Sequence, residues 1–484
     1  MTCPMDNTLQ SSGPRYARLT PEQCAKLHNA SLEILERTGI RFYDQGAIDL
    51  VRQAGAQVSD DNPVRLPARL VEQALSTAPR RVTLYNRDGQ PVMPVEGWRT
   101  FFGPGSDCLN IVDHRTWKRR QPILQDVVEG ITVCDALEHV DFAMSMFLPS
   151  DVNQEIADRY QMEVMLNHTA KPIVFVTYAL SGCVDAIEMA EALAGGAAAL
   201  REKPCVACYI NATNGLHHNQ EALQKLLYLA GKGLPAMYIP GVMAGLTEPV
   251  TVAGSTAVKN AGALVGIVLS QLKREGTPII VPGWGGVGLD MRTMVRPYCE
   301  PDHRGVAEAL AHNHNLVMFS LAGVSDAKLV DQQAGIEAAL TLMVEAVTGG
   351  HIVHDLGYLE SGLSYSLAQL VICDEIVAWI KHFIQDIEVT DESLALDVID
   401  QVGPDGQFLK SGHTRRHFRE RWYPRLFERD NYSGWLAKGS KTLAERAADS
   451  VEKILPTHKP KPLPEKVIQA IHIIVERAES RHAQ

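Results

Sequence analysis

From about residue 122 onwards, helix-length segments with one apolar face alternate with short segments that are apolar throughout. The short segments are predicted strands, at residues 141–149, 172–178, 204–212, 235–241, 278–283, 316–321 and 351–357. Helices are predicted at 122–137, 153–168, 182–194, 218–232, 251–275, 302–312, 331–348 and from about 364. Strands that are apolar on both faces are typical of a parallel sheet whose two faces are buried. The alternation predicts either a TIM barrel or a doubly wound sheet.

The choice between these two folds depends on phosphate-binding motifs. No GxGxxG follows the first strand and no P-loop occurs in the chain, which favours the barrel. Seven strand-then-helix units are visible, and residues 100–112 are the candidate for an eighth strand. We therefore predict an α/β fold, a TIM (β/α)8 barrel with an N-terminal helical and β-hairpin cap and a C-terminal helical extension. The expected domains are residues 1–120 for the cap, 121–388 for the barrel and 389–484 for the extension.

The two flanking regions have their own signals. The cap should contain helices near 20–38, 45–54 and 67–78 and a hairpin around Asp88-Gly89. Residues 413–435 mix basic and aromatic side chains, which predicts a helix packed on the barrel with a solvated basic face, or a docking surface for a partner protein. A Pro/Lys linker at 456–466 precedes a final amphipathic helix, 466–480. Its apolar stripe needs something to pack on, and we expect a second subunit and hence a homo-oligomer.

Composition narrows the classes of partner and the compartment. The net charge of −11 argues against nucleic acid or an anionic membrane as the main partner. The first residues have no apolar run, and the longest apolar patch, at about 261–269, is too short to cross a membrane. Nine scattered cysteines favour a reducing cytoplasm. Cys205 and Cys208 form the one CxxC pair, either as members of a buried strand or as a zinc or redox site.

Candidate functional side chains gather where the predicted strands end. Loops at these ends converge on one cavity in a barrel. They supply Asn211, Trp284 within a run of glycines, and His354, Asp355, Tyr358 and Glu360. Aromatic rings are frequent near the same ends, at Phe101, Phe102, Tyr178, Tyr209, Tyr238, Trp284 and Tyr358. Rings that face a pocket bind quaternary ammonium groups through the ring quadrupole, whereas rings that pack in the core carry no such role.

Segments spread over most of the chain resemble one known family. They are LHNASLEILERTGI (27–40), VRLPARLVEQAL (64–75), RRQP (119–122), EPVTVAG (248–254), QLKREGTP (271–278), LDMRT (289–293), GVSDAKLVDQQAGIEAAL (323–340) and HDLGYLESGLSYSLAQLV (354–371). Together they make the sequence similar to the trimethylamine:corrinoid methyltransferase family. Within it, the chain resembles the members without pyrrolysine that demethylate quaternary amines such as glycine betaine.

The resemblance implies a methyl transfer from a small quaternary amine to Co(I) of a corrinoid. The pattern Asp-x-His-x-x-Gly of cobalamin-binding domains is missing, so the corrinoid (cobalamin) is expected on a cognate corrinoid protein, and no bound metal is expected in this chain. The family's trimethylamine enzymes carry pyrrolysine, whereas this chain has ordinary residues throughout, which argues against trimethylamine as substrate. Glycine betaine, giving dimethylglycine, is the first candidate, and proline betaine, carnitine and γ-butyrobetaine stay open.

The same implied chemistry suggests roles for individual residues. His354, Tyr358 and Glu360 are the candidates for the catalytic group of the cavity. The candidates for substrate binding are Phe102 and Trp284 as cage rings, together with Tyr209, Asn211, Arg292 and His351. A betaine carboxylate would need a donor, for which His354, His351 and Arg292 are available.

Two readings from other classes compete with the methyltransferase. One is a non-catalytic barrel that binds betaines. The other is a metal-dependent barrel lyase or hydrolase that uses His351, His354 and Asp355. We disfavour the latter because residues along a strand alternate between its faces, so these three would not all point inward.

Overall fold

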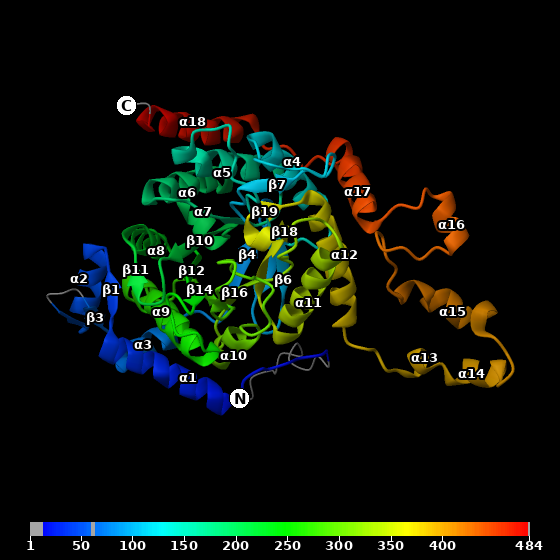
Figure 1. Cartoon of the computed structure of the whole chain (residues 1–484), viewed down its shortest axis with the longest axis horizontal. Coiled ribbons are helices and arrows are strands. Elements are labelled where there is room, and N and C mark those ends of the chain that lie inside the picture. The colour runs from blue at the N-terminus through cyan, green and yellow to red at the C-terminus, as the bar shows by residue number, and fades with distance from the viewer. Residues whose placement is uncertain (1–12, 60–62, 483–484) are drawn as a thin grey trace.

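The computed structural model describes residues 13–59 and 63–482, and a parallel sheet lies at its centre (Figure 1). The sheet has the order β6-β17-β16-β14-β12-β10-β9. Its strands, in chain order, are β6 (Phe101–Pro104), β9 (Ile173–Phe175), β10 (Val206–Ala212), β12 (Ala236–Pro240), β14 (Ile279–Pro282), β16 (Met318–Leu321) and β17 (Ile352–Leu356). Six of these were predicted as strands within three residues of their ends. The first, β6, comes from the 100–112 region, which was the expected source of an extra strand.

Residues 141–147 close the sheet into a barrel. The amide of Asp141 donates to the carbonyl of Phe102 in β6, at 2.6 Å. On the other side, Ala143 forms an isolated parallel bridge with Ile173 of β9, and the amide of Val174 donates to the Ala143 carbonyl at 2.9 Å. This segment therefore lies between the two edge strands and occupies the position of the eighth barrel strand. It was predicted as a regular strand over 141–149, but it pairs with its neighbours only through isolated bridge contacts. The TIM-barrel prediction is confirmed.

Helices surround the barrel. They are α4 (Leu124–Ala136), α5 (Ala157–His168), α6 (Leu180–Ala194), α7 (Ala197–Glu202), α8 (Gln220–Lys232), α9 (Val252–Lys273), α10 (Val306–Asn313), α11 (Gln332–Thr348) and α12 (Leu367–Phe383). By length and composition α9 could cross a membrane, but 78% of its most apolar window is buried inside the molecule, as in a core helix. Cys205 and Cys208 are buried at β10, which confirms the buried-strand interpretation of this pair.

The N-terminal cap packs against the outside of α9. Helix α1 (Pro21–Glu33) runs on through one π-helical turn (Ile34–Thr38) and ends at Gly39, whose φ of 74° suits glycine. The remaining elements are β1 (Ile40–Phe42), α2 (Gln45–Gln53), β2 (Gln57–Val58), β3 (Pro63–Arg65) and α3 (Ala68–Thr77), and β11 (His217–His218) joins their sheet. The predicted hairpin is present as β4 (Val82–Tyr85) and β5 (Pro91–Val95).

Two small sheets cover the carboxyl ends of the barrel strands, which we call the mouth. One has the order β18-β19-β7-β8 and is formed by β7 (Asn110–Val112), β8 (Arg119–Arg120), β18 (Tyr358–Leu359) and β19 (Ser364–Tyr365). The other pairs β13 (Met243–Ala244) with β15 (Val287–Gly288), which directly follow β12 and β14. The loops that carry the candidate side chains are thus held by short hydrogen-bonded ladders.

The C-terminal region differs from its prediction in two respects. Residues 413–435 do not form one helix on the barrel. They fold into the short helices α15 (Gly412–His417) and α16 (Tyr432–Ala437), which project to the side together with α13 (Asp391–Leu394) and α14 (Leu396–Val402) (Figure 1). The chain then returns through α17 (Leu443–Thr457), which packs on α12 and α4.

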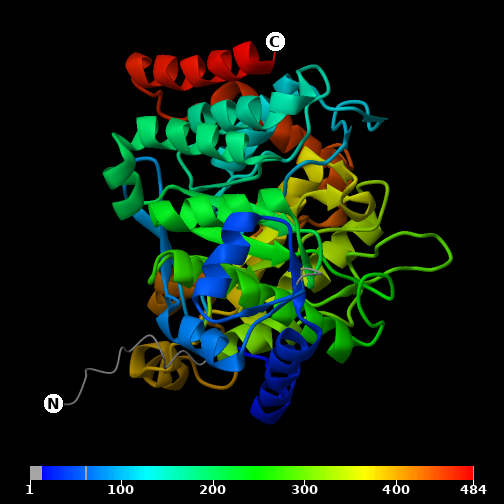
Figure 2. The same ribbon diagram turned by 90° about the vertical axis from the view of Figure 1, so that its left-hand side faces the viewer.

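The last helix, α18 (Glu465–His482), covers α5 and α6 of its own chain (Figures 1 and 2). Its apolar stripe, Ile471, Ile474, Val475 and Ala478, is buried there. The expectation that this stripe packs on a second subunit is therefore wrong, because the propensity of a single helix does not show which surface it covers.

Candidate active site

A small cavity lies inside the barrel mouth, where the predicted strand ends converge. Its volume is about 60 Å³. A buried water needs on the order of 10–15 Å³ in such a measure, so the cavity has room for only a small molecule. It is lined by Tyr209, Asn211, Ile239, Pro240, Gly241, Val242, Lys259, Trp284, Arg296, Tyr298, Leu321, His354 and Asp355.

A bulge in β17 brings two consecutive residues to this cavity. The pairing of β17 with β6 shifts register between Val353 and Leu356, and Asp355 has a φ of 85°. A positive φ is rare outside glycine, and such backbone strain collects at functional sites. Because the bulge interrupts the alternation of the strand, both His354 and Asp355 line the cavity, whereas simple alternation predicted opposite faces.

His354 is held as a neutral ring. Its Nδ1 lies 2.5 Å from the carbonyl of Ser320, so Nδ1 carries the hydrogen and donates it. Burial lowers the pKa of His354 to about 3, against the effect of this hydrogen bond. The ring stacks on Phe319 with centroids 4.0 Å apart, and its Nε2 lies 3.4 Å from Oδ1 of Asp355. The unprotonated Nε2 thus faces the carboxyl group.

Asp355 is a buried carboxyl group with a strongly altered acidity. Burial raises the pKa of Asp355 to about 8, and neighbouring Arg296 and Tyr358 only partly offset this effect. The hydroxyl group of Tyr358 donates its one hydrogen to the carbonyl of Ser106. Gly105 permits this arrangement, since a Cβ there would lie 2.3 Å from both Oδ1 of Asp355 and the hydroxyl of Tyr358. Perturbed carboxyl groups in a cleft are candidates for function.

Two cationic side chains face the same cavity. Lys259 reaches it from the buried middle of α9, and its ammonium lies 4.0 Å from the centroid of the Trp284 ring. Burial and the nearby Arg296 hold the pKa of Lys259 well below its usual value. The Nε of Arg296 and the Nε1 of Trp284 are buried donors with no hydrogen-bond partner among the described residues. Buried donors normally have an acceptor, so these two are available to an anionic group of a ligand.

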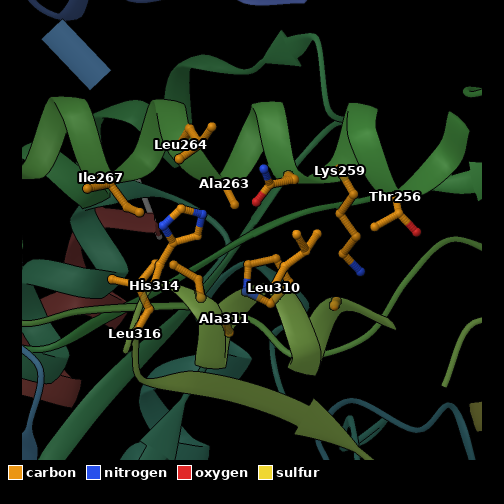
Figure 3. A pocket seen from close by; sticks show the side chains of 13 residues that line it. Thr256, Lys259, Ala263, Leu264, Ile267, Leu310, Ala311, His314 and Leu316 are labelled. Atoms are coloured by element: carbon orange, nitrogen blue, oxygen red, sulfur yellow. The ribbon is translucent and has the colours of Figure 1, made fainter. Parts of the chain in front are cut away.

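Lys259 also borders a second cavity, of about 20 Å³, between α9 and α10. Figure 3 shows its side chain leaving α9 beside Thr256 and pointing away from the aliphatic side chains Ala263, Leu264 and Ile267. That second space is lined mainly by apolar groups and is barely larger than one water, which is typical of a packing gap.

The structure brings together five of the nine predicted site residues. Tyr209, Asn211, Trp284 and His354 line the cavity, and Tyr358 reaches it through its contact with Asp355. The other four lie elsewhere. Glu360 is paired with Arg119 at 2.8 Å in the sheet over the mouth, and Phe102 is fully buried in the core beside Val353.

The remaining two predicted residues are further away. Arg292 is 89% exposed in its side chain and pairs with Asp290 at 3.0 Å. His351 lies at the amino end of β17, where its Nε2 donates to the Gly97 carbonyl at 2.8 Å and its Nδ1 accepts from the Met318 amide. His351 therefore belongs to the opposite end of the barrel from His354 and Asp355, and these three do not form the metal cluster of the lyase or hydrolase hypothesis.

Sequence reasoning missed Lys259, Arg296 and Tyr298, and it named Asp355 at a strand end without assigning it a catalytic or substrate-binding role. One signal was available for Lys259, because it is a lone cation in the middle of a 22-residue, largely apolar helix. A buried lysine of this kind is rare without a function.

Comparison with known proteins agrees with this picture. The model of the trimethylamine methyltransferase (MTTB) family matches residues 3–482. The chain belongs to this family. Trimethylamine methyltransferase MttB of Desulfitobacterium hafniense (strain DSM 10664 / DCB-2) is 32% identical over 471 residues, which cover 96% of this chain and 95% of that protein. A glycine betaine methyltransferase of Desulfitobacterium hafniense (strain Y51) is 30% identical and covers 92% of this chain and 94% of its own length.

The predicted family is thus confirmed, and with it the prediction of a corrinoid-dependent methyltransferase. Among solved structures, the monomethylamine methyltransferase of Methanosarcina barkeri covers 97% of this chain and 96% of its own at 11% identity, with a TM-score of 0.48. That likeness is too distant to add to the argument, and the barrel is established by the strand pairing alone.

Proposed function

We propose that this enzyme demethylates a zwitterionic quaternary amine, with glycine betaine as the first candidate and dimethylglycine as the product. The observation that carries this proposal is the presence of two cationic side chains, Lys259 and Arg296, in the same cavity as a carboxyl group and aromatic rings. A betaine has one positive and one negative end, and each finds a complement here. Trimethylamine has no negative end, so it would leave both cations unpaired in a buried site, which is unfavourable.

The cationic head would lie at the side of the cavity formed by Asp355, Tyr209 and His354. Tyr209 packs edge-on against His354, with centroids 5.7 Å apart, and the Nε2 of His354 lies 3.4 Å from Oδ1 of Asp355. Two rings and the carboxyl group therefore line the same side of the cavity. Aromatic faces and a carboxylate both attract a quaternary ammonium group. Trp284 was predicted as a cage ring, but the Lys259 ammonium already lies over one of its faces. Trp284 therefore supports the end of the cavity that we assign to the substrate carboxylate.

The carboxylate end would be held by Arg296 and Lys259. A guanidinium group binds a carboxylate through two parallel hydrogen bonds, and the unpaired Nε of Arg296 is one available donor. A carboxylate beside Lys259 would favour its charged form, which burial otherwise disfavours. These two residues take the place of Arg292 and His351, which we had expected in this role.

The chemistry needs positioning more than proton transfer. A quaternary N–CH3 group releases a neutral tertiary amine when the methyl group leaves, because nitrogen keeps the bonding electron pair. The corrinoid supplies the nucleophile, Co(I). The residues of this chain would bind the substrate, aim one methyl group at the mouth and exclude water, and no general acid is required. His354 is neutral and keeps its ring fixed through Ser320, so it shapes the cavity without a charge change.

The corrinoid would be presented by a separate protein at the mouth. Loops after β12 and β14 expose the apolar side chains Leu246, Val250, Met291, Met294 and Val295 there. Exposed apolar side chains clustered around a pocket are typical of a contact with another protein. We call this set the mouth rim. It fits a protein that carries a corrinoid face-on to the cavity.

The proposal is tested by comparing glycine betaine with choline, which keeps the quaternary head and replaces the carboxylate by a hydroxymethyl group. Calorimetry should show tighter binding of glycine betaine to the wild type. Arg296→Gln should raise the Kd for glycine betaine by on the order of tenfold to a hundredfold, as expected for the loss of a hydrogen bond to a charged group. The Kd for choline should stay unchanged. Arg292→Gln is the matched control, four residues away and exposed.

Methylation of reduced cobalamin then separates the reaction from mere binding. Glycine betaine, proline betaine, carnitine, γ-butyrobetaine and trimethylamine are each tried as methyl donors. Equal binding of choline and glycine betaine, or equal effects of Arg296→Gln and Arg292→Gln, would overturn the zwitterion proposal. Binding without methyl transfer, with both free cobalamin and a corrinoid protein supplied, would favour a betaine-binding barrel instead.

A further inference from the structure

The segment 385–423, which we call the arm, has no buried residue. It carries nine of the thirty large apolar side chains that are exposed in the described chain: Ile387, Val389, Leu394, Leu396, Ile399, Phe408, Leu409, Phe418 and Tyr423. Ile387 is 84% exposed and Leu409 is 77% exposed. Scattered single apolar side chains are normal on a surface, but this concentration over 39 residues is typical of a surface that another protein covers.

The arm has a defined shape although it stands away from the barrel (Figure 1). Thr390 caps α13, and Ser411 caps α15. Glu392 joins the two parts of the arm, since its carboxylate accepts hydrogen bonds from Arg416 at 2.7 Å and from His417 at 3.2 Å. An unstructured tail would lack such capped and cross-linked helices. Because the arm is already ordered, it would lose less conformational entropy when it binds a partner.

The arm has an acidic first half and a basic second half. Residues 386–405 contain seven Asp or Glu and no Lys or Arg, whereas residues 410–421 contain five Lys or Arg and one Glu. Several of these charges form no ion pair within the described residues: Asp391, Asp397, Asp400, Asp405, Lys410, Arg415, Arg419 and Arg421. A surface that carries both signs side by side is complementary to a copy of itself turned by 180°.

We propose that the arm binds a second copy of this chain, and that two copies exchange arms around a two-fold axis. The acidic half of each arm then meets the basic half of the other. Helices α11 and α12, which lie on the side of the barrel from which the arm projects, expose Ile336, Leu340, Trp379 and Phe383 for the partner's apolar residues (Figure 1). A standard interface takes about 20–30 residues from each partner, and the arm alone supplies that number.

The position of the arm favours a second copy over the corrinoid protein. Helix α12 begins just after β19 at the mouth, so its end at Phe383 lies at the opposite end of the barrel. Ile384, from which the arm departs, borders a groove there together with Trp98, His312 and His351. A corrinoid must reach the mouth, whereas a second copy held by the arm leaves the mouth free.

Charge reversal of the full-length protein tests the pairing. The wild type, at micromolar concentration, should have twice the chain mass of 53.2 kDa, or an even multiple, in light scattering. Asp397→Lys with Asp400→Lys reverses the acidic half, and Arg419→Glu with Arg421→Glu reverses the basic half. Each double variant should raise the Kd for self-association by on the order of a hundredfold, because like charges then face each other. Glu202→Lys with Glu275→Lys is the control for charge reversal at exposed, unpaired sites.

Mixing the two reversed variants gives the decisive result. In the mixture, each reversed half meets the reversed half of the other variant, so heterodimers should form although neither variant pairs with itself. A wild type that is monomeric, or that contains an odd number of chains, overturns the two-fold exchange. Unchanged self-association of both variants, or failure of the mixture to associate, overturns the arm as the interface. Loss of methyl transfer to a corrinoid protein, with self-association intact, would instead place that protein on the arm.

Discussion

Asp355 is a carboxyl group that the fold buries at the place proposed for the cationic head of the substrate. In the free enzyme its burial favours the protonated form up to about pH 8. A quaternary ammonium group beside it favours the ionised form, since the opposite charge stabilises the carboxylate. Binding of a cationic head should therefore release a proton at neutral pH, and affinity should rise as the pH approaches the pKa of Asp355.

The same residue gives a prediction on stability. Because its pKa is raised in the folded state, Asp355 contributes stability below the unfolded pKa of about 4 that is lost as the pH rises through about 8. Over this window the loss is at most about 1.4 kcal/mol per pH unit. Asp355→Asn keeps the shape and removes the titration, so its unfolding free energy should depend less on pH than that of the wild type.

Denaturant unfolding between about pH 5 and pH 9 measures this slope. The variant Glu275→Gln, at an exposed carboxyl group, is the control and should keep the slope of the wild type. Asp355→Asn should also weaken binding of glycine betaine, and most strongly at high pH, where the wild type is ionised. An identical pH dependence in Asp355→Asn and the wild type would contradict a buried, raised Asp355.

Residue-level reasoning from the sequence had a specific limit at this site. His354, Tyr209 and Asn211 could be found because they stand at the ends of recognisable strands. Asp355 was set aside because a regular strand alternates, and the sequence does not show the bulge that turns it inward. Arg296 lies in an irregular loop, where no periodicity predicts direction, and the nearby Arg292 was chosen in its place.

At the scale of elements, the loops after β12 and β14 contribute both to the cavity and to the surface around it. Their inner residues line the cavity, and their outer residues form the mouth rim. The short pairing of β13 with β15 ties the two loops together, so the rim can be altered without a change in the barrel strands.

This separation predicts a split between two activities. Leu246→Ser with Met294→Ser should reduce methyl transfer to a corrinoid protein by about tenfold or more, because apolar contact with that protein is lost. Transfer to free reduced cobalamin should stay within about twofold of the wild type, since neither residue lines the cavity. Leu436→Ser with Ile473→Ser is the matched control, since both side chains are exposed and lie outside the rim. Equal losses with both acceptors would contradict a docking role of the rim.

Elements of the barrel could be predicted because each buried strand is apolar on both faces and each helix has one apolar side. The segment 141–147, which takes the place of the eighth strand, was harder to predict. Its neighbours β6 and β9 are distant in sequence, and only the closed barrel brings them to its two sides. The largest error concerned residues 413–435, which were expected in one helix packed on the barrel. Residues 413–423 belong to the arm and contain no buried residue, whereas the amides of residues 425–427 donate to Glu375 of α12.

At the scale of the whole molecule, the two proposals assign different tasks to the two ends of the barrel. The mouth holds the cavity and the rim, and the arm departs from the opposite end. A methyltransferase that meets a second protein at each turnover benefits from this separation, because a permanent interface and a transient one do not compete for the same surface.

The final helix, α18, packs on the barrel of its own chain, whereas the arm projects away from the barrel. Asp185 of α6, which is almost fully buried, accepts hydrogen bonds from Arg477 and Arg481 of α18 as well as from Arg159. Ile471 is fully buried beneath the helix, while Ile473, two residues on, is 59% exposed. Ile471→Ala should therefore lower the free energy of unfolding by about 2–5 kcal/mol. Ile473→Ala should change it by less than about 0.5 kcal/mol.

Denaturant unfolding at several protein concentrations distinguishes packing within the chain from packing on a second copy. Packing of α18 on α5 and α6 makes the loss in Ile471→Ala independent of protein concentration, because no partner is involved in that contact. A loss that disappears at high concentration would mean that α18 is held by another chain. The arm variants should show the reverse behaviour, with a stability that depends on concentration and a helix α18 that stays in place.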